Sequence, residues 1–337
     1  MTQDHEKLIF TSKGKRIELG LGEVHKASRQ NDYRDTLEST LTEIVKGVKE
    51  GKNWRDLVKA VFEEKNPWLY KIITAKARTL FLEQYPLKNN SVILDIGSGW
   101  GQFTLPLAQD NIVCALEPTP ERIDFIIAAA RQEKKENKIY FVGEDYLKVN
   151  FETKFDYTLC IGVLEWIGSF SDGDAQETQR NFLKKIKQEL KPGGELIIGI
   201  ENRLGLKYLL GANDDHTGLP DISVYESNLA KEKYKTLTQK ELKVFTYSKS
   251  ELQELLENAG FTLVKYFAAL PDYKIPEIII PSGEEIEKYL EDNYIHEHDG
   301  SNGQKLQIQE ELKSMYNSLS NLGTASNFVP SFYIVAS

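Results

Sequence analysis

Strand-length apolar runs alternate with amphipathic segments between Ser91 and Glu201, and this alternation constrains the fold more than any other feature of the chain. The runs read SVILDIG, NIVCALEP, KIYFVGED, FDYTLCIGV and ELIIGIEN, and turn-forming residues bound them. Between the last two, Phe182, Leu183 and Ile186 recur at helical spacing. Buried strands that alternate with helices build a parallel sheet with helices on both faces. The sequence therefore predicts an α/β fold.

Composition excludes several classes of protein. A chain of 337 residues of which 40% are hydrophobic can bury a sizeable core. Its 42 Lys and Arg residues against 51 Asp and Glu residues give a net charge of −9, which repels phosphate backbones and predicts no nucleic-acid partner. No stretch reaches the roughly 20 apolar residues that span a bilayer, and the first residues do not form a signal peptide. We expect a cytoplasmic protein without membrane insertion.

The apolar pattern also predicts how the chain is organised. Residues 1–85 open with a hairpin that turns at Gly14 and continue with helical patterns, so we expect a helical N-terminal cap. Residues 86–337 are expected to form one domain, interrupted by polar insertions at about 201–245 and 272–328. The chain ends in SFYIVAS, which is typical of a buried strand that closes the sheet.

A glycine-rich turn follows the first apolar run of the alternating region. The segment VILDIGSGWG leads from a strand into Asp95 and then Gly97, Gly99 and Gly101. Glycines let the backbone turn sharply and approach a ligand closely at the carboxyl end of a strand. Gln102 stands where dinucleotide-binding enzymes have the last glycine of G-x-G-x-x-G, and the lysine of a phosphate-binding P-loop is absent. The turn therefore argues against an NAD-dependent enzyme.

Acidic residues follow the next strands along the chain. Glu117 ends the second apolar run, where a carboxylate can accept both hydroxyls of a ribose. Asp145, in GED, follows the third run and can accept the exocyclic amine of an adenine. The segment CIGVLE ends the fourth run at the same edge of the predicted sheet. The residues at successive strand ends therefore predict one site that binds an adenosine and contains additional acidic side chains.

Together these motifs resemble those of the class I S-adenosylmethionine-dependent methyltransferases. DIGSGWG is similar to their first motif, ALEP to their ribose acid, GED to their adenine acid, LCIGVLEW to their strand-four motif and LKPGGELIIGI to their fifth strand. The resemblance implies a Rossmann-like, seven-stranded, mostly parallel sheet with an N-terminal helical annex and insertions after strands five and six. It also implies S-adenosylmethionine as cofactor and S-adenosylhomocysteine as product.

The resemblance further implies a cofactor site built from Asp95, Gly97, Gly99, Gly101, Glu117, Asp145, Ile161 and Gly162. In that site the first two glycines approach the methionyl part, and the carboxylates of Glu117 and Asp145 hold the ribose and the adenine amine. Backbone carbonyls of Ile161 or Gly162 would contact the amino group. Trp166 stands where related small-molecule enzymes often have a histidine, so a histidine base from that position is not expected.

The acceptor side is predicted from the insertions. The block ENRLGLKYLLGANDDHTG and the segment PDYKIP resemble parts of methyltransferases of bacterial surface-glycan and peptide natural-product pathways, including lanthipeptide carboxyl methyltransferases. His216 in this block is predicted to act as a general base or to orient an acceptor, with a solvated loop residue as the alternative. Arg203 is predicted to clamp a carboxylate, or else to pair with Asp214 or Asp215.

No metal site is predicted. The two-residue spacing of His296 and His298 in IHEHD matches no established metal motif, and this segment is expected to be a solvated acidic loop.

Three functional hypotheses follow from these residues. The first is an O-methyltransferase that esterifies the carboxylate of a modified, lanthipeptide-type peptide. The second is methylation of a hydroxyl on a surface glycan or small molecule, and the third is a non-catalytic protein that binds S-adenosylmethionine or S-adenosylhomocysteine. The sequence leaves the acceptor and the oligomeric state open.

Overall fold

The computed structural model describes residues 7–27, 37–170, 172–293, 296–299 and 303–337. The chain forms two compact units, of which the first comprises Met1–Cys160 with Gln188–Leu196 and the second Ile161–Lys187 with Ile197–Ser337. The residues before Lys7, which bear on the expected lack of a signal peptide, lie outside the described residues. The boundary predicted at residue 85 falls inside the first unit, and the N-terminal cap at residues 1–85 stays a prediction.

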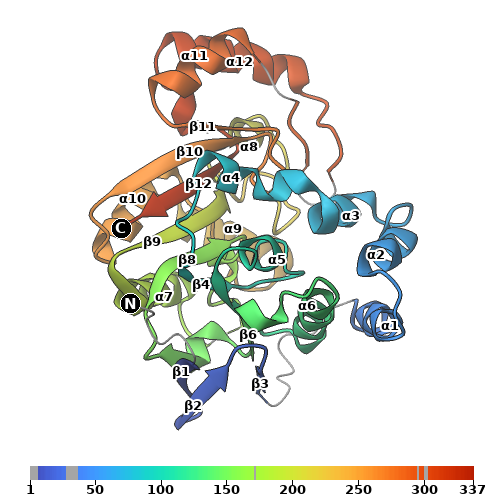
Figure 1. Ribbon diagram of the computed structural model, residues 1–337. Helices are drawn as coiled ribbons and strands as arrows, with labels where there is room; N and C mark the ends of the chain where they lie inside the picture. The colour runs from blue at the N-terminus through green and yellow to red at the C-terminus, as the bar shows by residue number, and fades with distance from the viewer. Residues whose placement is uncertain (1–6, 28–36, 171, 294–295, 300–302) are drawn as a thin grey trace. The chain divides into compact units, whose positions relative to one another are not determined.

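A parallel sheet forms the centre of the first unit, as the alternating runs predict (Figure 1). Its strands are β3 (Val24–Lys26), β4 (Val92–Ile96), β5 (Ile112–Leu116), β6 (Ile139–Gly143) and β8 (Phe155–Ile161). They pair in parallel in the order β8-β4-β5-β6-β3. Every residue of β4 is buried, because its apolar side chains are covered on both faces. Asp95 pairs with Ala115, which places the ends of β4 and β5 side by side.

A second, antiparallel sheet contains the predicted hairpin. Strands β1 (Lys7–Ser12) and β2 (Lys15–Gly20) are joined by a turn in which Gly14 has a φ of 74°, and β7 (Val149–Phe151) pairs with β1. Strand β3, in contrast, is not predicted from the sequence. It is three residues long and partly exposed, so it carries no apolar run.

Helices surround the sheet of the first unit. They are α1 (Glu38–Lys49), α2 (Trp54–Phe62), α3 (Pro67–Thr74), α4 (Leu80–Gln84), α5 (Thr104–Leu107) and α6 (Pro120–Gln132), with 3-10 turns η1 (Lys76–Thr79), η2 (Glu136–Lys138) and η3 (Tyr146–Lys148). Asn66 caps α3 by accepting a hydrogen bond from the backbone of Leu69, and Pro67 occupies its first position, as expected from Asn-Pro. Helix α1 packs against α6 (Figure 1).

Four aromatic rings anchor the glycine-rich turn to these helices. Trp100 lies within the turn and is buried, with its ring centroid 5.7 Å from that of Phe62 on α2 and 5.0 Å from that of Phe125 on α6. Trp54 at the start of α2 contacts Phe125 edge-on at 5.5 Å. These T-shaped pairs stabilise the turn.

The second unit holds further strands of the seven that the resemblance implies, and of these β9 has residues 190–196 in the first unit. Strand β10 (Val264–Leu270) pairs antiparallel with β12 (Ser331–Ala336) and with β11 (Ile278–Pro281), and β12 also neighbours β9 (Leu190–Glu201). The expected seven are β4, β5, β6, β8, β9, β10 and β12, so the C-terminal strand is confirmed. Strands β3 and β11 are additional edge strands that the count of seven omits.

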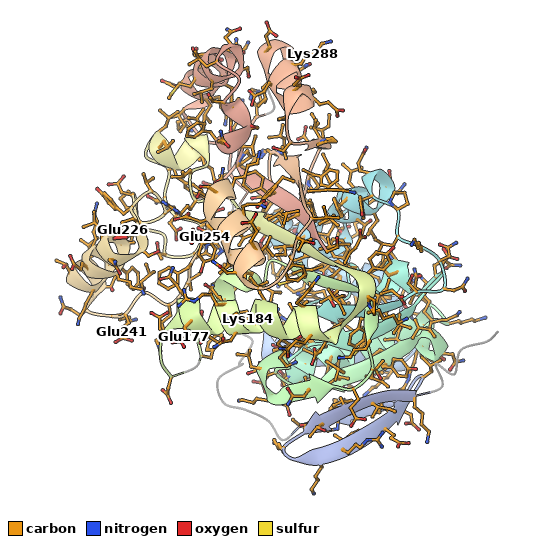
Figure 2. All side chains as sticks on the ribbon, turned by 90° about the vertical axis from the view of Figure 1, so that its left-hand side faces the viewer. Glu177, Lys184, Glu226, Glu241, Glu254 and Lys288 are labelled. Carbon is orange, nitrogen blue, oxygen red and sulfur yellow. The ribbon has the colours of Figure 1, made fainter. Side chains whose placement is uncertain are left out.

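The second unit holds helices α7 (Ala175–Glu189, with its last two residues in the first unit), α8 (Leu206–Leu209), α9 (Ser227–Thr238), α10 (Lys249–Asn258), α11 (Glu284–Asp292) and α12 (Gln309–Asn321), with 3-10 turns η4 (Leu164–Trp166) and η5 (Ala325–Asn327). Helix α7 buries Phe182 and Ile186 and exposes Glu177 and Lys184 (Figure 2). It ends directly at the start of β9. Among the described residues, no helix has both the length and the apolar character that crossing a bilayer requires.

Candidate functional site

The glycine-rich turn of the first unit has the conformation that the sequence predicts. Gly97, Gly99 and Gly101 have φ angles of 66°, 57° and 76°, a region that side chains disfavour. A Cβ atom on Gly101 would lie 3.3 Å from Leu105 Cγ and 3.4 Å from Ile126 Cγ1, so the start of α5 packs closely there. The amide of Gly97 donates to the carbonyl of Leu116 at 2.8 Å, which ties the turn to the end of β5.

Glu117 connects this turn to the next strand end. Its buried carboxylate accepts the backbone N–H of Gly99 at 2.9 Å through Oε2 and that of Thr119 at 2.9 Å through Oε1. A carboxylate offers about four acceptor positions, so two remain for further donors. The geometry therefore fits the predicted ribose acid: the side chain is held in place and retains acceptors for two hydroxyls.

Asp95 has a partner within the protein, and its place in the cofactor site stays a prediction. It is buried at the end of β4 and accepts a hydrogen bond from the hydroxyl of Thr104. Burial raises the pKa of Asp95 to about 7, while the Thr104 hydrogen bond opposes the rise. Asp95 thus fixes the start of α5 below the turn.

Asp145 lies beyond β6, the strand that neighbours β5. Its Oδ1 atom accepts the backbone N–H of Leu147 at 2.9 Å, so it caps the 3-10 turn η3. The adjacent Glu144 is buried and accepts from the hydroxyl of Ser12 at 3.2 Å. The structure thus places two acids after β6, next to the strand that ends in Glu117; recognition of adenine by Asp145 stays a prediction.

Ile161 and Gly162 belong to the second unit. Gly162 has a φ of 70°, and its amide donates to the carbonyl of Gly199 at 2.9 Å. A Cβ atom at this position would lie only 2.8 Å from the hydroxyl oxygen of Tyr273, so no larger residue fits without displacing that ring. A contact between these backbone carbonyls and the amino group of the cofactor remains a prediction.

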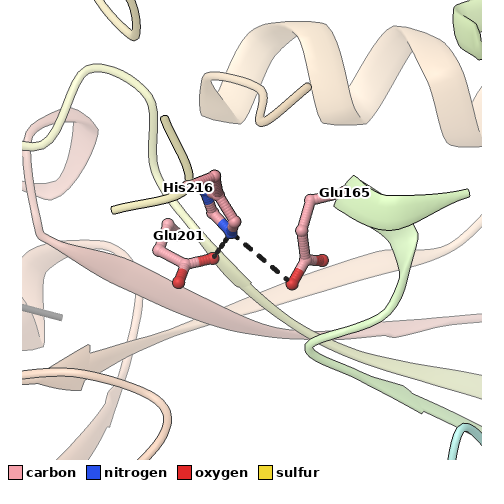
Figure 3. Close-up of side chains that lie close together, drawn as sticks. All are labelled: Glu165, Glu201 and His216. Atoms are coloured by element: carbon pink, nitrogen blue, oxygen red, sulfur yellow. Dashed lines mark ion pairs between the residues drawn. The ribbon is translucent and has the colours of Figure 1, made fainter. Parts of the chain in front are cut away.

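A buried acid and histidine cluster is the most unusual feature of the second unit. Glu165 in η4, Glu201 at the end of β9 and His216 in the loop after α8 point toward one another (Figure 3). The Nε2 atom of His216 lies 3.7 Å from Glu201 Oε2 and 3.9 Å from Glu165 Oε1. Its side chain is 7% exposed, so the alternative of a solvated loop residue is wrong. Trp166 packs edge-on against His216, with the ring centroids 5.3 Å apart.

Burial and charge act on this cluster in opposite directions. Burial raises the pKa of Glu165. For Glu201 the neighbouring Lys274 and His216 outweigh burial and hold the pKa below its usual value. Burial alone would lower the pKa of His216, but Glu201 and Glu165 raise it to about 9.

Two lysines connect the cluster to further acids. Lys274 is ion-paired with Glu201 and lies 3.5 Å from Asp272 Oδ2 and 3.8 Å from Asp215 Oδ2. Lys207 pairs with Asp215 at 3.1 Å, and both side chains are 3% exposed. The ENRLGLKYLLGANDDHTG block and PDYKIP thus meet in one network within the second unit.

Arg203 requires a correction. Its Nε atom donates to Glu251 Oε2 at 2.6 Å and its second terminal nitrogen donates to Glu251 Oε1 at 2.9 Å. Its other terminal nitrogen donates to the carbonyl of Val224 at 2.9 Å. The expected pairing with Asp214 or Asp215 is wrong, and the bidentate face that would clamp an acceptor carboxylate is already used by Glu251 on α10.

Comparison with known proteins agrees with the strand-end motifs. Residues 94–198 match the family model described as a methyltransferase domain. The chain contains a class I methyltransferase domain. Enzymes of this class use S-adenosylmethionine, and the matched segment includes the glycine-rich turn, Glu117, Asp145 and Glu165.

Curated relatives match only part of the chain. The ubiquinone biosynthesis O-methyltransferase of Rickettsia canadensis is 30% identical over 120 residues, which are 35% of this chain and 46% of that protein. The enzyme of the same name from Rickettsia typhi is 27% identical over 135 residues, 39% of this chain and 50% of that protein. The chain thus spans about half the length of the curated relatives it matches.

Solved structures of methyltransferases are also similar. The CcbJ methyltransferase of Streptomyces caelestis is 15% identical, with a TM-score of 0.45, and the match covers 78% of this chain and 88% of that one.

Sequence reasoning missed Glu201 and the two lysines. Glu201 ends a strand beside Asn202 and Arg203, and a polar run after an apolar strand gave no reason to single out one residue. Lys274 was inside a recognised segment, PDYKIP, but its link to Glu201 joins residues 73 apart in sequence and is visible only in the fold.

Proposed function

We propose that the chain is an S-adenosylmethionine-dependent O-methyltransferase that acts on a hydroxyl group of a biosynthetic intermediate. The methyltransferase domain supports the reaction class. Cofactor binding is supported above all by the hydrogen bond from the amide of Gly99 to Glu117. This bond holds the carboxylate that would accept the ribose hydroxyls against a turn whose positive φ angles favour glycine. In such a site Glu117 would hold the ribose, and Gly97 and Gly99 would let the sulfonium part approach the backbone.

A hydroxyl acceptor suits the cluster of the second unit. Glu165 and Glu201 each have an Oε2 atom that is buried and has no hydrogen-bond partner among the described residues. A hydroxyl donates a hydrogen bond to such an oxygen, and a methyl transfer to that hydroxyl requires a group that takes its proton. His216 between the two carboxylates helps to hold them in position.

A peptide carboxylate, the acceptor favoured from the sequence alone, loses its support. That hypothesis depended on Arg203 as a clamp, and Arg203 is held by Glu251. The remaining candidate site offers two buried carboxylate oxygens without a donor in the described part of the chain, and an anionic acceptor has no proton to donate to them. A surface-glycan or small-molecule hydroxyl is therefore the better proposal, and the exclusion of nucleic acid stays a prediction.

Cofactor binding can be tested on Glu117. We expect Glu117→Ala to weaken S-adenosylhomocysteine binding by at least about 1.5 kcal/mol in calorimetry, since it removes a pair of charge-assisted hydrogen bonds. Glu189→Gln is the matched control, because Glu189 is also buried in the first unit and accepts a backbone N–H, that of Phe151, at 2.9 Å. Equal affinity in the wild type and the Glu117 variant would remove Glu117 from the site.

The acceptor class can be tested with a labelled methyl group. Label is transferred from S-adenosylmethionine to separate glycan, small-molecule and peptide fractions, which are then treated with mild alkali. Ether products keep the label, as the proposal expects. Release of the label as methanol would mean that the product is an ester, and the peptide carboxylate would again be the favoured acceptor. Binding of S-adenosylhomocysteine without transfer to any fraction would favour the non-catalytic alternative.

A further inference from the structure

The three side chains of the buried cluster have the composition of a metal site. Among the described residues, Glu165, Glu201 and His216 each offer one ligand atom, and these atoms all lie within 4.8 Å of one another. They come from three different segments, and Figure 3 shows the imidazole between the two carboxylates. Two carboxylates and one imidazole, which gives up its proton on binding, are ligands that divalent first-row metals accept.

Distances within the cluster exclude hydrogen bonds between its members. The separations of 3.7 Å and 3.9 Å from His216 Nε2 exceed the range for N–H···O contacts, about 2.7–3.2 Å. Ligands about 2.1 Å from a tetrahedral metal lie about 3.4 Å apart. A closure of a few tenths of an ångström would therefore bring His216 Nε2 and each carboxylate oxygen to the spacing of two ligands on one metal.

Unpartnered oxygens are the independent observation that points to a cation. The Oε2 atoms of Glu165 and Glu201 are inaccessible to solvent and accept no hydrogen bond, and both residues are 1% exposed. An unpaired buried carboxylate oxygen is costly, so proteins pair such atoms with donors or with metal ions.

Neighbouring residues hold each ligand in place. Lys274 binds the other oxygen of Glu201 and leaves Oε2 directed at His216. Asp214 accepts the backbone N–H of His216 at 3.1 Å and fixes the loop that carries it. The carbonyl of Glu165 accepts the amide of Phe245 at 3.2 Å. Supported ligands of this kind are typical of metal sites.

We propose that Glu165, Glu201 and His216 bind a divalent transition-metal cation such as Mn²⁺ or Zn²⁺ within the second unit. The ligand atoms are His216 Nε2, Glu201 Oε2 and one carboxylate oxygen of Glu165. The sequence predicts no metal here because the three residues have no characteristic spacing: they lie 36 and 15 positions apart. The site does not depend on the identity of the methyl acceptor. If the proposed methyl transfer occurs, a bound cation would also favour the deprotonated form of a coordinated hydroxyl.

Mn²⁺ binding to the full chain tests the proposal. The electron paramagnetic resonance signal of free Mn²⁺ is measured during titration of the chelator-treated protein. We expect one Mn²⁺ per chain, with affinity at least about tenfold lower in Glu165→Gln. The matched control is Glu297→Gln, because Glu297 is equally buried in the second unit and also has an unpartnered Oε2 atom, but belongs to no such cluster.

Two further measurements keep the test decisive if a variant fails to fold. In wild-type protein, electron spin echo spectra of bound Mn²⁺ should show coupling to an imidazole nitrogen, which an all-oxygen site would lack. Zn²⁺ should raise the melting temperature of the wild type more than that of His216→Gln. An unchanged free Mn²⁺ signal, binding without nitrogen coupling, or equal affinity in Glu165→Gln would each overturn the proposal. None of these readouts requires methyl transfer, so failure of the proposed function would remain distinguishable.

Discussion

The ion pair between Lys207 and Asp215 permits a quantitative test of how burial controls the energetics of the second unit. The Nζ atom of Lys207 lies 3.1 Å from Asp215 Oδ2, and both side chains are 3% exposed. Lys207→Met keeps the length of the side chain and removes its charge. Asp215 then stays buried, with Lys274 at 3.8 Å as its nearest remaining lysine in the network.

The expected loss follows from the desolvation of Asp215. Removing one partner of a buried pair typically costs 3–5 kcal/mol, because the remaining charge cannot reach water. Since Lys274 compensates in part, we expect Lys207→Met to lower the free energy of unfolding by about 3 kcal/mol. The double variant Lys207→Met/Asp215→Asn removes both charges and should recover at least about half of that loss.

A second lysine–aspartate pair provides the matched control. Lys231 lies 3.0 Å from Asp174 Oδ2, but the two side chains are 32% and 44% exposed. Lys231→Met should therefore cost no more than about 0.5 kcal/mol. Urea unfolding followed by circular dichroism, with a chelator present and at constant pH, measures all four proteins. Unchanged m values would show that the comparison concerns stability alone.

Two results would refute this reasoning. One is a loss in Lys207→Met no larger than that in Lys231→Met, which would mean that water reaches Asp215. The other is a double variant no more stable than the single one, which would assign the loss to packing of the lysine stem rather than to the unpaired carboxylate.

Three further changes should have distinct effects in the same assay. The pKa of Asp95 is about 7 in the folded state against an ordinary 3.8, so the folded state is stabilised while Asp95 is protonated. Raising the pH from about 5 to about 8 should therefore lower the free energy of unfolding of the wild type by about 2.5 kcal/mol more than that of Asp95→Asn. Parallel pH profiles of the two proteins would contradict this. Gly168 has a φ of 93°, and a Cβ atom on it would lie 2.7 Å from the Cα atom of Ala175, so Gly168→Ala should cost about 3 kcal/mol of stability. Gly173 has a φ of 97° but no atom of a described residue within 4 Å of such a Cβ, so Gly173→Ala should cost only about 1 kcal/mol. Ser248→Ala removes the capping box of α10 and should cost about 1 kcal/mol, and a change below 0.2 would show that the cap adds nothing.

Local patterns in the sequence were sufficient to predict the strand ends of the first unit. The run VILDI is apolar because it is buried on both faces, and Gly97, Gly99 and Gly101 adopt positive φ angles that their residue type favours. Glu117 could be located because a strand end is a position that sequence alone defines. For these elements the deciding interactions join neighbours in sequence or adjacent strands, so local chemistry carries the information.

Side-chain partners far apart in sequence could not be predicted. Arg203 offered the correct chemistry for binding a carboxylate, but the choice of Glu251 over Asp214 depends on where α10 packs. His216 looked equally like a loop residue because its burial depends on Glu165 in η4 and on Glu201 at the end of β9, which are distant in sequence. Edge strand β3 was not predicted for another reason: its three partly exposed residues are too few to show a periodic pattern.

The interleaving of the two units in the sequence has a consequence for synthesis on the ribosome. The first unit lacks Gln188–Leu196 until the intervening Ile161–Lys187, which belongs to the second unit, has been made. The second unit in turn acquires β12, the partner of β10, only with the last residues of the chain. Neither unit can therefore be completed before part of the other has been made, and no single cut in the polypeptide separates the residues of the two units.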